Sequence, residues 1–226
     1  MIRVNDPMRN IPLHPMEPHR GSGFASLLPF GLTQEAIAVT MEMMSVIVLA
    51  ENYLQGTLEN PDILAIGAMR DRAHHRLLSL PTGAVLSGSL KASGLYECYR
   101  LTALLFETGV LFPMPRSTGV PLRIIQEIKK CVYQISLVDL FCEAKRPFFI
   151  WVLMLIGVAT DGLPDRQWIM EMLTDLLTLE GVSRWSDIKK IVDSFLWMDF
   201  ACDSGAIALW HDVAMSIREE EEARCV

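Results

Sequence analysis

The chain has 226 residues, of which 51% are hydrophobic and 21% charged, and its formal net charge at pH 7 is −7. The mean hydropathy is +0.29. This composition excludes a disordered tail or a low-complexity array, because such chains cannot bury enough apolar surface to offset the entropy lost on folding. The overall basic excess that is usual for a nucleic-acid-binding face is absent. We expect one large domain or two small ones.

The length of the apolar runs argues against a membrane protein. The longest uncharged apolar run, residues 148–160, has 13 residues, whereas a spanning helix needs about 18 or more. The second richest stretch, residues 37–50, contains Glu42. The N-terminal residues lack an apolar signal-peptide core and are interrupted by prolines. We therefore predict no membrane segment.

The cysteines indicate a reducing compartment. The chain contains five, an odd number, with gaps of 33, 11, 60 and 23 residues and no Cys-x-x-Cys pair. This spacing excludes a zinc ribbon and a thioredoxin-like motif. The nucleus or the cytoplasm is the expected location.

The N-terminal segment differs from the rest of the chain. Residues 1–31 contain five prolines and three glycines, a density that interrupts helices and strands alike. We interpret residues 1–31 as an extended or flexible lead-in. One helical domain is expected over residues 32–226.

Helical periodicity dominates the first half of this domain. Thr33 is a suitable N-cap for a helix that ends near Gly56, and Asn60-Pro61 is a start signal for a second helix that runs to about Leu78. A third helix is predicted over residues 95–108. The clearest apolar stripe then repeats at spacings of 4, 3, 4, 3 and 4, which places six side chains on one face of a single helix. They are Ile124, Ile128, Cys131, Ile135, Val138 and Cys142.

Four more helices are predicted in the second half. Residues 147–159 are apolar all round, so this helix is expected in the middle of the fold. The next helix begins at Pro164 and stops at Gly181. Another takes Ser186 as its N-cap and extends to Met198, and the last covers residues 206–217. Strand-like alternation is sustained nowhere, so the predicted class is all-α, a single domain of about eight helices.

The expected core and the final helix junction follow from the same pattern. Five side chains should be mostly buried: Trp151, Leu153, Leu155, Phe195 and Trp197. A glycine next to aspartate and serine is typical of a helix-to-helix junction. We therefore predict that Asp203 or Ser204 caps the final helix, and that Asp199 and Asp203 are structural.

Two kinds of side-chain cluster have a composition that metal chemistry uses. Asp71 lies three and four residues before His74 and His75, but no third or fourth ligand has matching spacing, so an exposed charged helix face is the favoured interpretation. The acid pairs Asp199 with Asp203 and Asp139 with Glu143 suggest an isoprenoid-synthase alternative, in which carboxylates hold magnesium and a diphosphate. Neither pair forms the aspartate-rich run that this chemistry needs.

No catalytic machinery is visible elsewhere. Nucleophile elbows, phosphate-binding loops and dinucleotide fingerprints are absent. The chain is therefore predicted not to be an enzyme, and no catalytic, cofactor-binding or metal-binding residue and no cofactor is assigned.

Methionine and the acidic C-terminus suggest interaction surfaces only weakly. Seven methionines fall on predicted helices: Met41, Met43, Met44, Met154, Met170, Met172 and Met198. They suit a pocket for an apolar ligand or a helical partner, although ordinary core filling is the favoured interpretation. The run Glu219–Glu222 is interpreted as the solvated end of the last helix.

Four segments resemble, in their order and spacing, a known family. They are RDRAHHRLLSLP (70–81), CYRLTALLFETGVLFPMP (98–115), RPFFIWVLMLIGVATDG (146–162) and SDIKKIVDSFLWMDFACDSGAIALWHDV (186–213), the last with an FLWxDxxCDxG core. Together they resemble the fungal-specific transcription factor domain, the regulatory region found C-terminal to zinc binuclear-cluster DNA-binding modules. The resemblance covers most of residues 35–215.

The resemblance implies an all-helical domain that modulates transcription by dimerising, by masking an activator or by responding to a small metabolite. The family's six-cysteine zinc cluster should precede this domain, yet residues 1–31 contain no cysteine and no basic helix. We therefore expect no direct DNA binding by this chain and no membrane contact. Either the chain is a regulatory domain that acts through a protein partner, through dimerisation or through an apolar small-molecule effector, or it is part of a longer gene product.

Overall fold

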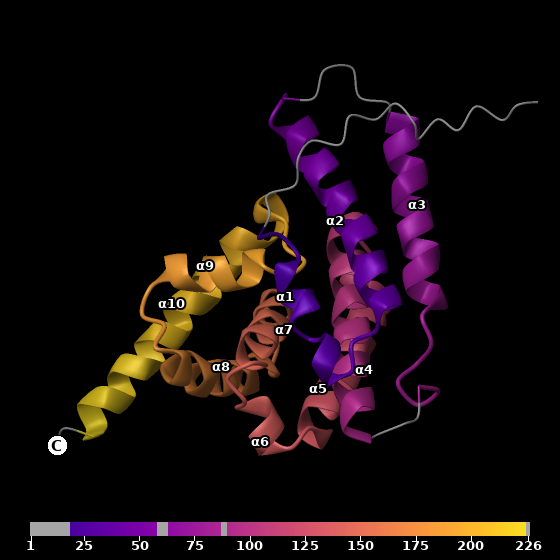
Figure 1. Ribbon diagram of the computed structural model, residues 1–226. Helices are drawn as coiled ribbons and strands as arrows, with labels where there is room; N and C mark the ends of the chain where they lie inside the picture. The colour runs from indigo at the N-terminus through magenta and orange to yellow at the C-terminus, as the bar shows by residue number, and fades with distance from the viewer. Residues whose placement is uncertain (1–18, 58–62, 87–89, 225–226) are drawn as a thin grey trace, which may run out of the picture.

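The computed structural model describes residues 19–57, 63–86 and 90–224 (Figure 1). All regular secondary structure in these residues is helical, which confirms the all-α class and the single helical domain. Eight of the α-helices there have nine residues or more. The elements are α1 (Ser22–Ala25), η2 (Leu28–Phe30), α2 (Gln34–Leu54), α3 (Ile63–Ser79), α4 (Leu90–Phe106), η3 (Glu107–Leu111), η4 (Arg116–Thr118), α5 (Val120–Gln134), α6 (Leu137–Leu140), α7 (Arg146–Ala159), α8 (Arg166–Glu180), α9 (Trp185–Asp193) and α10 (Asp199–Arg224).

The centre of the fold is α7, as its composition predicts. Helices α8, α9 and α10 pack against it, and α4 packs on another side (Figure 1). All ten residues from Phe148 to Gly157 are buried. A helix with no polar face is stable in water only when neighbours cover it all round, and this requirement accounts for the arrangement of the other helices.

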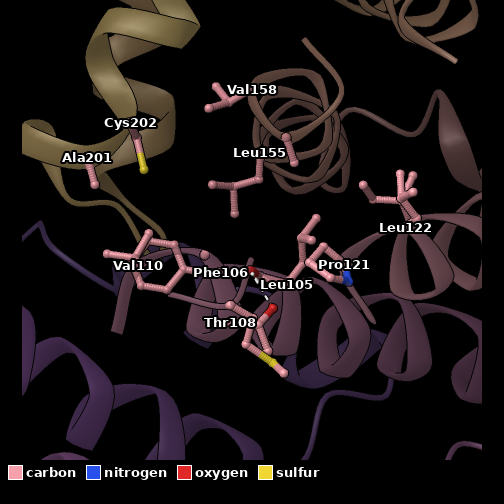
Figure 2. A pocket seen from close by; sticks show the side chains of 14 residues that line it. Leu105, Phe106, Thr108, Val110, Pro121, Leu122, Leu155, Val158, Ala201 and Cys202 are labelled. Atoms are coloured by element: carbon pink, nitrogen blue, oxygen red, sulfur yellow. Dashed lines mark hydrogen bonds between the residues drawn. The ribbon is translucent and has the colours of Figure 1, made fainter. Parts of the chain in front are cut away.

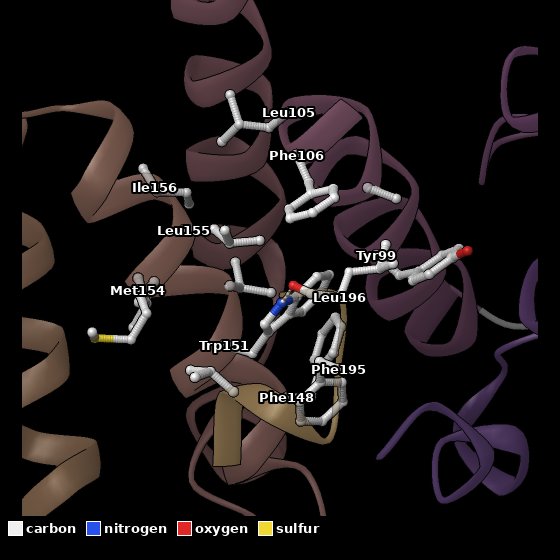
Figure 3. Packing of buried hydrophobic residues seen from close by; sticks show 14 of the residues in the cluster. Tyr99, Leu105, Phe106, Phe148, Trp151, Met154, Leu155, Ile156, Phe195 and Leu196 are labelled. Atoms are coloured by element: carbon white, nitrogen blue, oxygen red, sulfur yellow. Dashed lines mark hydrogen bonds between the residues drawn. The ribbon is translucent and has the colours of Figure 1, made fainter. Parts of the chain in front are cut away.

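Aromatic side chains surround Trp151 of α7. Its ring stacks on Phe195 at a centroid distance of 5.4 Å and meets the edge of Phe24 at 5.2 Å. Its indole Nε1 donates a hydrogen bond to the carbonyl oxygen of Leu196 at 2.8 Å, so the buried donor is satisfied (Figure 3). The five residues predicted to lie in the core are all buried, and that prediction is confirmed.

Part of the predicted lead-in belongs to the core. Residues 22–30 form α1 and η2, and Phe24 and Leu27 are fully buried. The amide of Gly23 donates to the carbonyl oxygen of Ser194 at 2.8 Å, and a Cβ at Gly23 would collide with the Phe195 ring. The prediction of an extended segment is therefore wrong for residues 22–30, because their apolar side chains cover α7. Residues 1–18 lie outside the described part of the chain.

Helix α2 follows the prediction and is also the one candidate for a membrane span among the described residues. Thr33 caps it, its hydroxyl oxygen accepting from the Ala36 amide at 3.1 Å. By length and composition alone its 21 residues could cross a bilayer, although core helices of globular proteins pass the same test. Inside the fold, Thr40 of α2 makes a buried 2.5 Å hydrogen bond to Tyr99 of α4.

Helix α3 packs on α2 and, less extensively, on α4 (Figure 1). It contributes only three buried residues, Ala65, Ala73 and Leu77. The predicted start signal Asn60-Pro61 lies outside the described residues. The predicted end near Leu78 is confirmed, since α3 ends at Ser79.

The long apolar stripe does not form one helix. Helix α5 ends at Gln134, and Ile135 is extended with ψ 135°. Ser136 then caps the short α6, its hydroxyl oxygen accepting from the Asp139 amide at 3.1 Å, and Val138 is 84% exposed. The prediction of a single helix through Cys142 is wrong because a serine that can cap a new helix competes with continuation of the old one.

The junction before the last helix also differs from the prediction. Helix α9 takes Arg184 rather than Ser186 as its N-cap residue and ends at Asp193. Helix α10 already begins at Asp199, so Gly205 lies inside it, against Val158. The predicted cap by Asp203 or Ser204 is therefore wrong. Phe195 and Met198 face the core from the short α9–α10 connection.

Two helical glycines should respond in opposite ways to substitution by alanine, because only one of them lies at the close contact between α7 and α10. A Cβ at Gly157 would collide with Leu209 Cδ2, so Gly157→Ala should destabilise the protein by about 1–3 kcal/mol. Gly67 in α3 has nothing within 4 Å of an added Cβ, so Gly67→Ala should be neutral or stabilise by about 0.5–1 kcal/mol. Urea denaturation measures both, and a Gly157→Ala variant as stable as Gly67→Ala would contradict the packing.

Candidate functional site

An apolar pocket lies where α4, η3, α5, α7 and α10 meet (Figure 2). It has a volume of about 240 Å³, and none of its lining side chains is charged. Figure 2 shows Leu155 of α7 and Cys202 of α10 facing Phe106 of α4 across it. The lining residues are Leu105, Phe106, Thr108, Gly109, Val110, Met114, Pro121, Leu122, Ile125, Leu155, Val158, Ala159, Ala201 and Cys202.

The size and chemistry of this pocket define what it can bind. An apolar cavity of about 150 Å³ holds benzene, so this one has room for a bicyclic or branched hydrocarbon of about ten carbons. A charged ligand would lose its hydration without finding an opposite charge. The pocket therefore suits a neutral apolar molecule.

One wall of the pocket is a π-helical turn that the sequence pattern did not predict. The predicted helix over residues 95–108 ends as α4 at Phe106, and the chain continues as the π-helical η3. The amide of Phe112 donates to the Glu107 carbonyl oxygen at 2.8 Å, and the amide of Met114 to that of Thr108 at 2.8 Å. Such turns accommodate an extra residue in a helix and are frequent at functional sites.

Cys202 contributes an apolar wall rather than a nucleophile. It is buried, and burial raises the pKa of its thiol to about 12. The thiolate is the reactive form of cysteine, so at neutral pH this side chain is an inert thiol. The pocket thus binds by shape and apolar contact.

Behind the π-helical turn lies a polar contact that involves one of the predicted histidines. His74 Nδ1 is 2.6 Å from Glu107 Oε1, and the Glu107 side chain is 1% exposed. Asp71 instead pairs with Arg70 at 3.1 Å, and His75 is exposed. The prediction of an exposed charged face is confirmed for Asp71 and His75 but is wrong for His74, which is partly buried against Glu107. Within the described ranges, no three His, Cys, Asp or Glu side chains are grouped so that they could hold a metal ion.

Glu107 is the functional candidate that the sequence analysis missed. It lies in a mainly apolar segment, and no pattern in the sequence distinguishes it. Its Oε2 atom is buried with no hydrogen-bond partner in the described structure. Burial raises the pKa of the Glu107 carboxyl, while His74 and Arg70 act in the opposite direction.

The aspartates considered for an isoprenoid enzyme surround a lysine. Lys189 Nζ lies 2.6 Å from Asp199 Oδ1, 2.5 Å from Asp193 Oδ1 and 3.5 Å from Asp203 Oδ1. Asp203 Oδ1 also accepts a 2.7 Å hydrogen bond from the indole Nε1 of Trp197. These three carboxylates thus share one lysine cation of the chain itself.

The second acid pair does not converge on a site either. Asp139 Oδ1 accepts from Lys145 Nζ at 2.6 Å, and Asp139 Oδ2 accepts from the Ser136 hydroxyl at 2.6 Å. Glu143 is exposed in the turn that follows. This arrangement stabilises the α6 region through local contacts.

All three basic dipeptides of the sequence are engaged with acids. Lys129 and Lys130 pair with Asp165 and Glu127, each at 2.6 Å. The remaining pairs are Lys145–Asp139, Arg146–Glu180, Lys189 with its three aspartates and Lys190–Asp187. A lysine already paired with a carboxylate offers little net charge to a phosphate backbone.

The methionines named above do not line the pocket. Met43, Met44, Met154 and Met198 are buried in the core, whereas Met41, Met170 and Met172 are partly buried. The interpretation as core filling suits the four buried ones. The acidic run 219–222 lies within α10, and its side chains are outside the described part.

Comparison of the chain with models of known protein families, with curated proteins and with solved structures finds no match. The resemblance to the fungal transcription factor domain therefore rests on the four segments given above.

The contact between Trp197 and Asp203 predicts a graded loss of stability. Asp203→Ala leaves the buried indole N–H without an acceptor, so the free energy of unfolding should fall by about 1–3 kcal/mol. Asp203→Asn retains an acceptor oxygen and should cost less. Urea denaturation with and without EDTA makes the test. A wild type that EDTA destabilises, beside an Asp203→Ala variant that EDTA leaves unchanged, would identify a metal ligand instead.

The buried Glu107 carboxyl predicts a pH dependence of stability. Because its pKa is higher in the folded than in the unfolded chain, the folded chain holds more protons between the two values, and stability falls as the pH rises through them. As the pH rises from the ordinary range of a carboxyl group through the raised pKa of Glu107, the wild type should lose more stability than Glu107→Gln, which cannot titrate. Urea denaturation across this range tests it, and parallel stability curves would contradict it.

Proposed function

We propose that the chain is a helical regulatory domain that responds to a small, neutral, apolar molecule bound in the α4–α5–α7–α10 pocket. It acts through a protein partner or a second copy of itself and does not contact DNA directly. The observation that carries this proposal is the pocket lining, which is uncharged throughout.

The position of the pocket supports a regulatory role. Its walls come from helices far apart in sequence, with Phe106 on α4, Pro121 on α5, Leu155 on α7 and Cys202 on α10. A ligand that contacts all four helices favours the arrangement in which they enclose it. The free energy of ligand binding can thereby shift the relative positions of the helices. A partner that binds one of these arrangements more tightly would respond to the ligand.

A role in transcription, and hence in the nucleus, is supported by the resemblance of the four sequence segments. Independence from DNA is supported by the net charge of −7 and by the ion pairs that engage the basic dipeptides. In this proposal the ligand and the partner bind at different places: the ligand binds in the pocket, and the partner binds on the surface of the domain.

The alternative, an isoprenoid-class enzyme, is less well supported. That chemistry needs several carboxylates to collect magnesium ions around a diphosphate. Asp199 and Asp203 instead share Lys189, and Asp139 is bound to Lys145. We therefore propose a binding function rather than catalysis.

Naphthalene is a suitable probe because it is neutral, bicyclic and has ten carbons. It should bind saturably in isothermal titration calorimetry and raise the melting temperature, since a ligand that binds only the folded state stabilises it. Naphthalene-1-sulfonate should bind at least about tenfold more weakly, because its charge finds no partner in the pocket.

A pair of variants on α10 locates the binding. Ala201 and Ala208 are both exposed on this helix, but only Ala201 lines the pocket. Ala201→Trp should abolish naphthalene binding, and Ala208→Trp should leave it unchanged. A wild type that does not bind, or equal binding by both variants, would refute the pocket. Magnesium-dependent turnover of a prenyl diphosphate, lost in Asp199→Ala, would favour the enzyme.

A further inference from the structure

The π-helical turn has two sides with different chemistry. On one side, Thr108, Gly109 and Val110 line the apolar pocket. On the other side, Glu107 meets His74 of α3 at 2.6 Å. Glu107 and Thr108 are neighbours in the chain, so the backbone position of one constrains the other.

Helix α3 covers the end of this turn as well. The guanidinium of Arg70 lies 4.1 Å from the centre of the Phe112 ring, and the His74 ring lies 4.7 Å from the same centre. The contact of α3 with the turn thus combines a hydrogen bond, a cation–π contact and a ring contact. None of these three side chains, Arg70, His74 and Phe112, lines the pocket.

Polar contacts matter for α3, because only three of its 17 residues are buried and two of these are alanines. Arg76 Nη1 lies 2.5 Å from Glu42 Oε1 and fixes α3 to α2. The His74–Glu107 contact fixes it to the π-helical turn. Since Glu107 is buried and its second oxygen lacks a partner in the described structure, losing His74 would remove the hydrogen-bond partner of its first oxygen as well.

We propose that the His74–Glu107 hydrogen bond positions the π-helical turn and thereby sets the affinity of the pocket for its ligand. His74 acts through Glu107 on the wall Thr108–Val110 and touches no ligand itself. This inference rests on the proposed function, and it adds that the ligand-binding wall is controlled from α3, on the outer side of the turn. A partner that moves α3 would change ligand affinity, and the ligand would change partner affinity by the same factor.

The test uses three variants of α3 in the full chain, with naphthalene as the probe. His74→Leu removes the ring nitrogen that is hydrogen-bonded to Glu107 Oε1, whereas His74→Asn places an amide group, which can donate or accept, close to the position of Nδ1. His75→Leu makes the same apolar change at the exposed neighbouring histidine. We expect about tenfold weaker naphthalene binding for His74→Leu, and a change of at most about threefold for the other two.

A fourth variant separates positioning from general loss of stability. Thr40→Val removes the buried hydrogen bond to Tyr99, far along α4 from the turn, and should lower the melting temperature without changing naphthalene affinity. Hydrogen exchange gives a readout without ligand: the amides of residues 109–112 and of Met114 should exchange faster in His74→Leu but not in His74→Asn or Thr40→Val.

The outcomes distinguish the two proposals. If the wild type binds naphthalene and His74→Leu binds it equally well, the positioning role is overturned while the proposed function stands. The positioning role is also overturned if Thr40→Val weakens binding as much as His74→Leu, since stability alone would then explain the loss. If the wild type does not bind naphthalene, the proposed function fails and the affinity claim fails with it.

Discussion

The structure depends on one constraint, which is that α7 has no polar face and must be covered on every side. Its ten buried residues, Phe148–Gly157, form the centre against which helices from both halves of the chain pack. Trp151 shows how this is done: its ring is covered by Phe24 from the N-terminal segment and by Phe195 from the α9–α10 connection. Burial of this much apolar surface is the main favourable term for folding.

The pocket lies where the helices around α7 leave a gap beside its C-terminal end. Leu155, Val158 and Ala159 belong to the C-terminal turn of α7, and they face the end of α4 and the beginning of α10. There α4 gives way to the π-helical turn, which forms one wall of the pocket. A regular α-helix continued through Thr108 would present different side chains to α7, so the pocket and the π-helical turn belong together.

Charged side chains mostly connect elements at the edges of this core. Lys189 joins α9 to the start of α10 through Asp199 and Asp203, and Arg76 joins α3 to α2 through Glu42. Such partly exposed pairs contribute little stability each, but they define how helix ends and outer helices are placed. His74–Glu107 is the exception, because its carboxylate is buried and its loss would leave an unsatisfied polar group.

The sequence by itself determined the helical class, the boundaries of α2, α7 and α8 to within about two residues and the central position of residues 147–159, because periodicity and caps are local properties of the chain. It also identified five core residues, one of which is Trp151. It did not predict the packing of Phe24, the break at Ser136 or the early start of α10, because each depends on a distant neighbour or on competition between two local structures. The pocket and the His74–Glu107 contact were decided only by the tertiary structure. Their residues come from helices that are far apart in sequence, and only the cover that α7 requires brings these helices together.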